Sequence, residues 1–167
     1  MPEIIVIAHN IRSTHNVGAI FRTCEGFGVK KIILSGYTPY PFIAGSHPAS
    51  RDERLPHIRE KLTAQIHKTA LDAELLVPFE HLEAPNLQEL KEDGYRIVAL
   101  EQHATSISLS HYEAPAKIAL LLGEEVEGIE QSLLEQCDDS IEIPMQGKKE
   151  SFNISVATGI ALYGLTT

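Results

Sequence analysis

Three segments place glycines and polar side chains inside otherwise apolar runs, at positions where folding alone does not require them. These segments are residues 10–29, 119–129 and 141–165. In the second, ALLLGEEVEGI, an apolar run passes directly into glycines and three glutamates. A carboxylate at the C-terminal edge of a strand lies where open α/β sheets bind ligands, although a solvated acidic turn is the commoner outcome. This edge is therefore a candidate ligand site.

The first segment carries its polar residues on a predicted helix. Apolar residues recur at spacings of three and four over 15–27, which predicts an amphipathic helix that ends at Gly28. Arg22 lies roughly opposite the apolar stripe, where a solvated arginine is usual. Asn16 stands at the start of the helix, where an asparagine is typical as a cap.

The third segment combines a strand end, a basic loop and a final helix. The strand ends at Pro144, a Gly-Lys-Lys loop follows, and Ser151 or Asn153 can cap the helix. Capping accounts for one such residue, but not for Ser151, Asn153 and Ser155 together.

Other common nucleotide and hydrolase motifs are incomplete in this sequence. GFGVKK at 26–31 follows a predicted helix instead of a strand, so it does not fit a dinucleotide fingerprint. GKK at 147–149 lacks the other residues of a P-loop, and the chain has no G-x-S-x-G motif.

The elements that must position these residues alternate between strands and helices. Strands are expected at 3–9, 30–35, 73–80, 95–101, 117–123 and 140–145, and helices at 15–27, 59–69, 86–93, 129–136 and 151–165. This alternation predicts a single α/β domain over 1–167, with a mainly parallel sheet flanked by helices. The irregular stretch 36–57 holds four of the nine prolines and should be a long surface loop.

Composition narrows the class of protein. The 167 residues are 43% hydrophobic and 22% charged, which is typical of a globular domain, and the net charge of −9 argues against sequence-blind adhesion to nucleic acid or membrane. The sequence has no long apolar run and no basic flank before its first apolar segment, so we expect no membrane span and a cytoplasmic location. Cys24 and Cys137 are far apart without ligand spacing, which predicts plain core thiols.

Taken together, the three segments resemble one branch of the SPOUT superfamily, the SpoU or TrmH-like branch. The members of this branch are RNA ribose 2′-O-methyltransferases. The first motif reads NVGAIFRT at 16–23, the second LGEEVEG at 122–128, and the third IPM at 143–145 followed by SFNIS at 151–155. They follow the family's order and span nearly the whole chain. Phe152 departs from the family's usual leucine, and the residues before Asn16 depart from its Asp-Pro pair.

The resemblance implies a C-terminal trefoil knot, S-adenosylmethionine bound within it, and a homodimer. Generic rules disfavour threaded chains, so the knot is expected from the resemblance alone. The cofactor-binding residues implied by the resemblance lie in the loops after three strands and in the third motif: Leu100, Glu101, Leu122, Gly123, Ile143, Met145, Ser151 and Phe152.

The resemblance also implies roles for individual side chains. Arg22 would clamp the phosphate beside the target ribose and orient its hydroxyl, because an arginine does not deprotonate near neutral pH. Asn16 would support it, and Glu125, Ser151 and Asn153 would complete the catalytic set. The cofactor brings its own reactive methyl group, so no metal is required.

The last helix supports the homodimer independently. It carries one apolar stripe through residues 154, 157, 161 and 165 and a second through Val156, Ile160 and Tyr163. A helix that is apolar on two faces must bury both, and a second subunit can cover one of them.

The identity of the substrate stays open at this point. We expect a structured RNA, with tRNA favoured over rRNA, and the alternatives are a SPOUT base methyltransferase or a catalytically silent RNA-binding protein. An acidic chain must bind RNA through local positive charge. Its candidate basic residues either contact phosphates or form a solvated surface, and they are Arg12, Arg22, Arg51, Arg54, Arg59, Lys61, Lys148 and Lys149.

Overall fold

Seven parallel strands form one sheet in the computed structural model, which describes residues 1–44 and 52–167. Their order across the sheet is β3-β2-β1-β6-β4-β7-β5. All strand pairs are parallel, which confirms the predicted α/β class. The strands are β1 Glu3–His9, β2 Lys31–Ser35, β3 Phe79–Leu82, β4 Arg96–Leu100, β5 Ile107–Ser108, β6 Lys117–Leu122 and β7 Asp139–Glu142.

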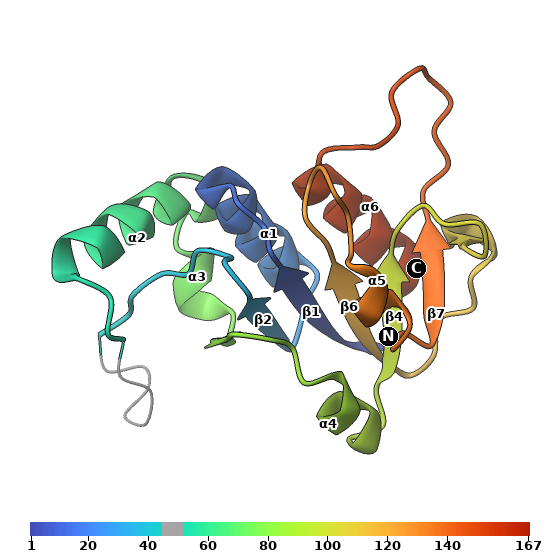
Figure 1. Cartoon of the computed structure of the whole chain (residues 1–167), viewed down its shortest axis with the longest axis horizontal. Coiled ribbons are helices and arrows are strands. Elements are labelled where there is room, and N and C mark those ends of the chain that lie inside the picture. Colours follow the sequence, from blue (N-terminus) through green and yellow to red (C-terminus); the bar gives the residue numbers. More distant parts are fainter. Residues whose placement is uncertain (45–51) are drawn as a thin grey trace.

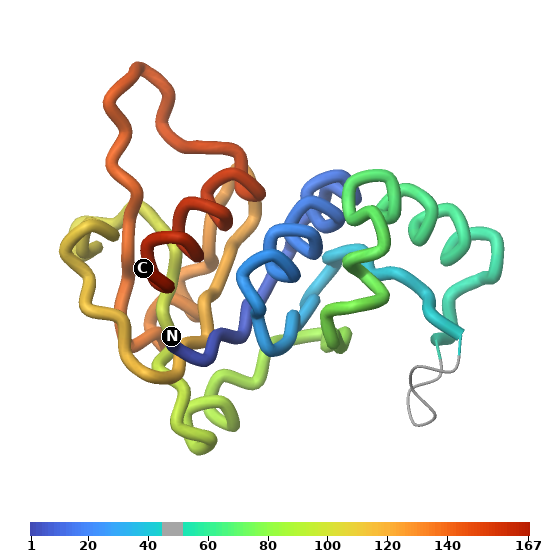
Figure 2. The backbone as a smooth tube through the Cα atoms, turned by 180° about the vertical axis from the view of Figure 1, so that it is seen from behind, coloured from blue at the N-terminus to red at the C-terminus, as the bar shows by residue number. Residues whose placement is uncertain are grey.

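Helices cover both faces of this sheet (Figure 1). They are α1 Thr14–Gly26, α2 Pro56–Ala70, α3 Ala73–Leu76, α4 Leu87–Glu92, α5 Gln131–Leu134 and α6 Ile154–Thr166, with a 3-10 turn, η1, at Leu109–His111. Figure 2, which views the chain from behind, shows α1 and α6 in front of the strands and α2 beside α1. The short helices α4 and α5 pack on the other face.

The alternation of side chains along β1 divides the core into two layers. Ile4 and Val6 face α1, α2 and α6, whereas Ile5 and Ile7 face α4 and α5. Strands buried on both faces read as continuous apolar runs, and this explains why EIIVIAH and KIALLL predicted strands correctly.

One expected strand is wrong in part. Residues 73–80 were predicted to be extended, but Ala73–Leu76 form helix α3 and the strand runs from Phe79 to Leu82. Leu71 and Asp72 have positive φ values of 49° and 76°, so the chain turns sharply before it can extend. Residues 73–76 are Ala, Glu, Leu and Leu, which are strong helix formers, and none of them is β-branched.

Other differences concern short elements and their ends. β5 has two residues and η1 three, which is too short for a periodic pattern to predict. Helix α2 begins at Pro56, so the irregular segment expected over 36–57 ends slightly earlier. Arg51, a candidate RNA contact, lies outside the described residues.

Two simpler expectations are also settled. No helix among the described residues combines the length and the apolar character needed to span a membrane. Cys24 is buried and Cys137 half-buried, and both are unpaired thiols, as predicted. Burial raises the pKa of Cys137 to about 11 and raises that of Cys24 further.

Candidate functional site

The loops after β4, β6 and β7 meet the start of α6 around a cavity of about 530 Å³. The carboxyl ends of parallel strands share one edge of a sheet, so polar residues after each strand converge there. The sequence predicted this edge from the glycines and glutamates that follow Leu122. The lining residues of the cavity are Asn16, Leu100, Glu101, Gln102, Gly123, Glu124, Glu125, Val126, Glu127, Gly128, Glu142, Ile143, Glu150, Ser151, Phe152, Asn153, Ile154 and Ala157.

A tight turn over 123–128 forms one wall of this cavity. The backbone amides of Glu124 and Gly128 donate to each other's carbonyl oxygens at 3.1 and 2.8 Å. A Cβ atom at Gly123 would lie 2.5 Å from Ile129 Cγ1 and 2.6 Å from the Gly128 carbonyl carbon, so this position requires glycine. The family resemblance implied a cofactor-binding role for Gly123, and the structure adds that the turn itself requires glycine there.

Two glutamates stabilise the turn from inside. Glu124 is buried, and its Oε2 accepts hydrogen bonds from the amides of Val126, at 3.0 Å, and Glu127. Glu101 connects the loop after β4 to the turn, because its Oε2 accepts from Ile129 N at 2.9 Å and its Oε1 from Gln102 N at 3.1 Å. The cavity wall is therefore held by side chains of two different loops.

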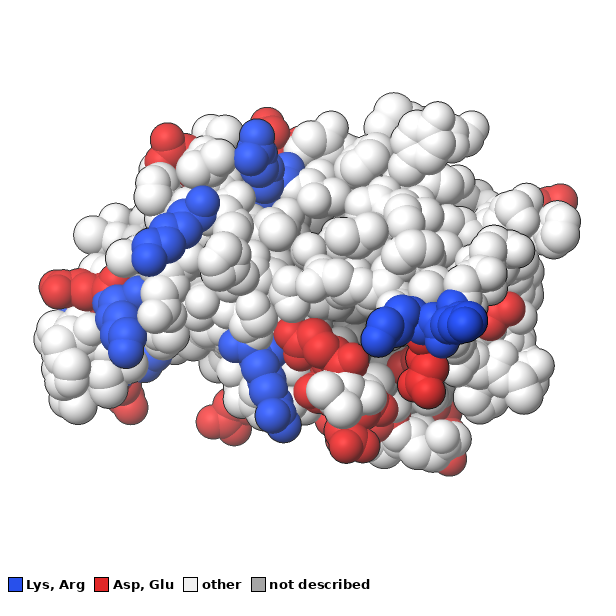
Figure 3. Space-filling model, turned by 90° about the horizontal axis from the view of Figure 1, so that it is seen from above, with Lys and Arg blue, Asp and Glu red and all other residues white. Residues whose placement is uncertain are grey.

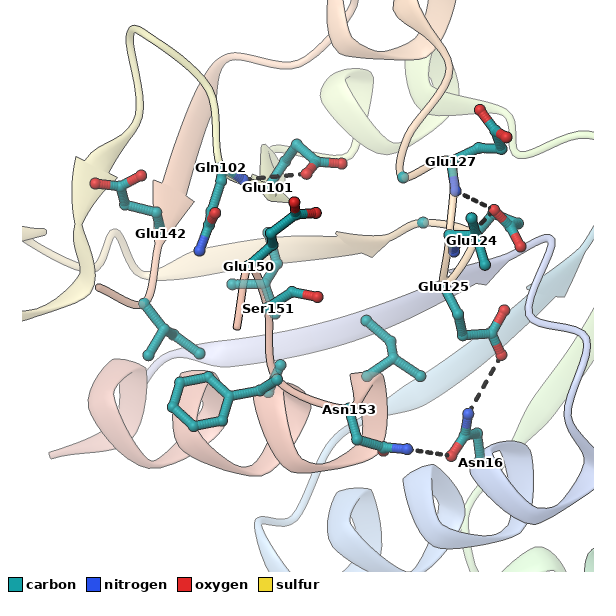
Figure 4. A pocket seen from close by; sticks show the side chains of 18 residues that line it. Asn16, Glu101, Gln102, Glu124, Glu125, Glu127, Glu142, Glu150, Ser151 and Asn153 are labelled. Carbon is teal, nitrogen blue, oxygen red and sulfur yellow. Dashed lines mark hydrogen bonds between the residues drawn. The ribbon is translucent and has the colours of Figure 1, made fainter. Parts of the chain in front are cut away.

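A chain of three polar side chains lies at the edge of the cavity (Figure 4). Asn16 Nδ2 donates to Glu125 Oε1 at 3.3 Å, and Asn153 Nδ2 donates to Asn16 Oδ1 at 3.2 Å. Glu125 also accepts from the backbone amides of Arg12, at 3.3 Å, and Ser13, at 3.5 Å. Residues from all three sequence motifs are thus joined in one hydrogen-bonded unit.

The helix caps explain why these asparagines lie there. The expected cap role of Asn16 is wrong, because the Ser13 hydroxyl caps α1 by accepting from Asn16 N at 3.1 Å. The Asn16 side chain is consequently available to the cavity. Asn153 does cap α6, as predicted, since its Oδ1 accepts from Ser155 N at 2.9 Å.

Arg22 is the one predicted catalytic residue that lies outside the cavity of its own chain. It is exposed on α1, and among the described residues it has no hydrogen-bond or ion-pair partner. This matches the solvated position expected from its place opposite the apolar stripe. The neighbouring Thr23 lies against α6, since its Cγ2 is 3.6 Å from where a Cβ of Gly159 would be.

The predicted cofactor-binding residues divide into two groups. Leu122 is fully buried in the core, and Met145 is half-buried beyond β7, so neither lines the cavity. Ser151 does, but among the described residues its side chain has no hydrogen-bond partner. The predicted residues that do line the cavity are Leu100, Glu101, Gly123, Ile143, Ser151 and Phe152.

The charge of the lining is the strongest chemical feature of the site. Six glutamates line the cavity: Glu101, Glu124, Glu125, Glu127, Glu142 and Glu150. No lysine or arginine among the described residues lines it. Gln102, Glu142 and Glu150 were not predicted from the sequence, although each lies close after a strand end or near a motif, and Glu124 and Glu127 were noted only as members of the second motif. Such a lining favours a ligand with positive charge and disfavours phosphates.

Positive charge lies near the cavity but outside it. Arg12 Nε is 3.6 Å from Glu124 Oε1, and that oxygen, although buried, accepts no hydrogen bond from the described residues. The Tyr37 side chain, and after it Glu124, raises the pKa of Arg12, so this exposed guanidinium stays charged. Figure 3 shows acidic side chains gathered between basic ones on this side of the molecule.

Comparison with known proteins gives consistent matches over nearly the whole chain. The model of the SpoU rRNA Methylase family matches residues 3–61 and 52–163. The tRNA (guanosine(18)-2′-O)-methyltransferase of Aquifex aeolicus is 32% identical over 96% of this chain and 67% of its own length. The tRNA (guanosine(18)-2′-O)-methyltransferase TARBP1 of Mus musculus is 31% identical over 98% of this chain, which spans 9% of that protein.

Solved structures match the fold of this chain over nearly its whole length as well. A crystal structure of an AdoMet-bound rRNA methyltransferase from Sinorhizobium meliloti superimposes with a TM-score of 0.79 at 22% identity. The match covers 98% of this chain and 55% of that one. The chain therefore spans only part of the proteins that it resembles.

Proposed function

The chain belongs to the SpoU rRNA methylase family, and from this premise we propose that it methylates the ribose 2′-hydroxyl of a nucleotide in a structured RNA, with S-adenosylmethionine as cofactor. The observation that carries the proposal is the hydrogen-bonded unit of Asn16, Glu125 and Asn153 beside an acidic cavity. It brings side chains of all three motifs to one place.

The lining of the cavity suits the cofactor in its backbone groups and its charge. Gly123 allows the tight turn that forms one wall, and between residues 145 and 152 no described backbone amide donates a hydrogen bond within the chain. Free amides at Ser151 and Phe152 suit recognition of polar ligand atoms. S-adenosylmethionine supplies a methyl group on a positively charged sulfonium, and the six glutamates favour that charge.

The protein's own contribution is then positioning. Asn16 is held from both sides, by Glu125 and Asn153, so its side chain has a fixed orientation. Ser151 is free to donate or accept a hydrogen bond at the reacting ribose. Arg22 binds the adjacent phosphate as a bidentate donor and orients the hydroxyl.

We propose that the protein is a homodimer that pairs through α6. The stripe through Ala157, Ala161 and Leu165 is buried in the core, whereas Val156 is 50% exposed and Tyr163 63% exposed. This helix has no charged residue, and the view from above in Figure 3 shows a broad surface without charge. An apolar helix face of this kind is covered most simply by a second copy. In such a dimer Arg22 lies one helix away from the interface and can reach RNA held across both subunits.

The trefoil knot is part of the same proposal. The chain leaves β6 at Leu122, passes to β7 on the far side of β4, and returns so that α6 packs near α1. These crossing connections support a threaded C-terminal segment around the cavity, as the family resemblance implies.

The substrate class is RNA, either tRNA or rRNA, and the proposed location is the cytoplasm, where two unpaired thiols such as Cys24 and Cys137 are usual. The similar proteins carry names that refer to both RNA types. A base methyltransferase and a silent RNA-binding protein remain the alternatives.

The deciding experiment incubates the protein with labelled S-adenosylmethionine and total RNA, followed by nucleoside analysis by mass spectrometry. We expect label in a ribose-methylated nucleoside. Label in a base would support the base methyltransferase, and RNA binding without label would support the silent protein.

A further inference from the structure

A buried histidine outside the cavity joins three parts of the chain. His9 is the last residue of β1 and is 6% exposed. Its Nδ1 lies 2.9 Å from Ser35 Oγ at the end of β2, and its Nε2 lies 2.6 Å from Glu130 Oε1. Glu130 directly follows the turn and Ile129, so the histidine connects two strand ends to the loop that forms the cavity wall.

Serine, histidine and glutamate are the residue types of a hydrolytic triad, but the burial excludes that role. A nucleophilic hydroxyl must reach a substrate carbonyl carbon, and Ser35 is 0% exposed. The three residues therefore form a fixed hydrogen-bond chain. With Nε2 protonated, His9 donates to Glu130, and Nδ1 accepts from the Ser35 hydroxyl.

The loop over 123–130 is held at several points, and each has a separate anchor. Glu125 accepts from Asn16 at 3.3 Å near the start of the loop. Ile129 N donates to Glu101 Oε2 at 2.9 Å. The His9–Glu130 contact holds the end of the loop against β1. Between these anchors lies the turn that lines the cavity.

We propose that His9 and Glu130 are positioning residues, which hold the 123–130 loop in the conformation that binds S-adenosylmethionine. The inference rests on the proposed function. A hydrogen bond between imidazole and carboxylate is stronger than one between neutral groups, so its loss loosens the end of the loop. The apparent affinity for a ligand falls in proportion to the population of the binding-competent conformation.

Glu130 is the suitable residue for a test, because its side chain is 54% exposed and its removal leaves no core cavity. Glu130→Ala removes the contact, whereas Glu130→Gln keeps an oxygen that accepts from His9. Glu135→Ala is the matched control, since Glu135 is an exposed glutamate just after α5, and Gln131 is its one hydrogen-bonded neighbour within the described part of the chain. Cofactor affinity is measured by calorimetry, and hydrogen exchange is measured on the ligand-free proteins.

We expect Glu130→Ala to weaken S-adenosylmethionine binding roughly three- to tenfold and to increase exchange over residues 123–130. Glu130→Gln should restore most of the cofactor affinity and most of the protection from exchange. Glu135→Ala should match the wild type in both measurements. Unchanged affinity and exchange in Glu130→Ala would overturn the inference, as would an increase in exchange spread over the whole chain. A wild type that binds no cofactor would refute the proposed function, while the exchange data would still decide whether the pair holds the loop.

Discussion

Asn153 donates an amide hydrogen bond to Asn16 Oδ1 across 3.2 Å, which joins the cap of α6 to the first turn of α1. The two residues are 137 positions apart in sequence. Asn16 in turn bonds Glu125, so the loop after β6 is fixed relative to both helices. The site is therefore assembled only when the C-terminal helix packs in place.

Asn153 serves both the cap of α6 and the site, so one substitution there should affect stability and activity together. Asn153→Ala removes the bond to Asn16 and the cap on Ser155 N, so we expect a loss of about 1 kcal/mol in the free energy of unfolding. Methyl transfer should fall as well, because Asn16 loses one of its two partners. Urea denaturation and a methyl-transfer assay measure the two effects. Ser155→Ala is the control, since it keeps the backbone cap; equal losses in both variants would contradict the role of the Asn16 contact.

Arg22→Ala should abolish methyl transfer while cofactor affinity and dimerisation stay near wild type. Arg22 lies outside the cavity and has no partner among the described residues of its own chain, so its removal leaves the cofactor site intact. Calorimetry, light scattering and a transfer assay test the three properties. Lys68→Ala removes an exposed cation from α2 as a control. A fully active Arg22→Ala protein would overturn the catalytic assignment.

The dimer should depend on the exposed face of α6. Tyr163→Glu places a charge on the stripe that contains Val156, and burial of an unpaired charge is costly, so the variant should be monomeric. Light scattering at micromolar concentration gives the mass. Ser132→Glu adds the same charge at an exposed position of α5 and should leave the dimer intact. A monomeric wild type would show that this face has another role.

Local patterns in the sequence were sufficient for the strands β1, β2, β4, β6 and β7 and for the edge that carries the site. The apolar runs at β1 and β6 and the glycines after Leu122 are patterns among residues adjacent in the sequence. They could therefore be interpreted without a structure. The helix α3 could not, because two residues with positive φ turn the chain before it. The pairing of His9 with Glu130 spans 121 positions and arises only when β1 lies beside β6.

The loop arginines show how a charge pattern can conceal a structural role. The sequence left Arg54 as a phosphate contact or a solvated residue, but its side chain is 17% exposed and bonded to both oxygens of Asp52. Its guanidinium also lies 3.5 Å above the Tyr40 ring. These contacts occupy the groups that would bind a phosphate.

RNA binding should consequently respond differently to two arginine substitutions. Arg12→Ala removes an exposed cation beside the cavity, so the slope of log affinity against log salt should flatten by roughly one unit. Arg54→Ala should leave that slope unchanged and lower the free energy of unfolding by about 2 kcal/mol, because Asp52 loses its charged partner. Binding titrations at several salt concentrations and urea denaturation measure both. A flatter slope in Arg54→Ala would show that Arg54 contacts RNA phosphates after all.

Stability should also depend on pH through the contact between α2 and α3. His67 Nδ1 lies 2.6 Å from Oε1 of the buried Glu74, and this hydrogen bond, more than the weaker attraction of Asp72, raises the pKa of His67 above its ordinary value of 6.5. A raised pKa in the folded state means that protonated His67 stabilises the fold. The contribution is complete below pH 6.5 and is lost as the pH rises through the raised value.

The melting temperature of the wild type should therefore fall between about pH 6 and about pH 9 by more than that of His67→Gln, which has no titrating group there. His57→Gln is the matched control, because His57 is exposed on the same helix and has no partner among the described residues. The melting temperature of His57→Gln should depend on pH in the same way as that of the wild type. Parallel profiles for the wild type and His67→Gln would show that the His67–Glu74 contact does not stabilise the folded state.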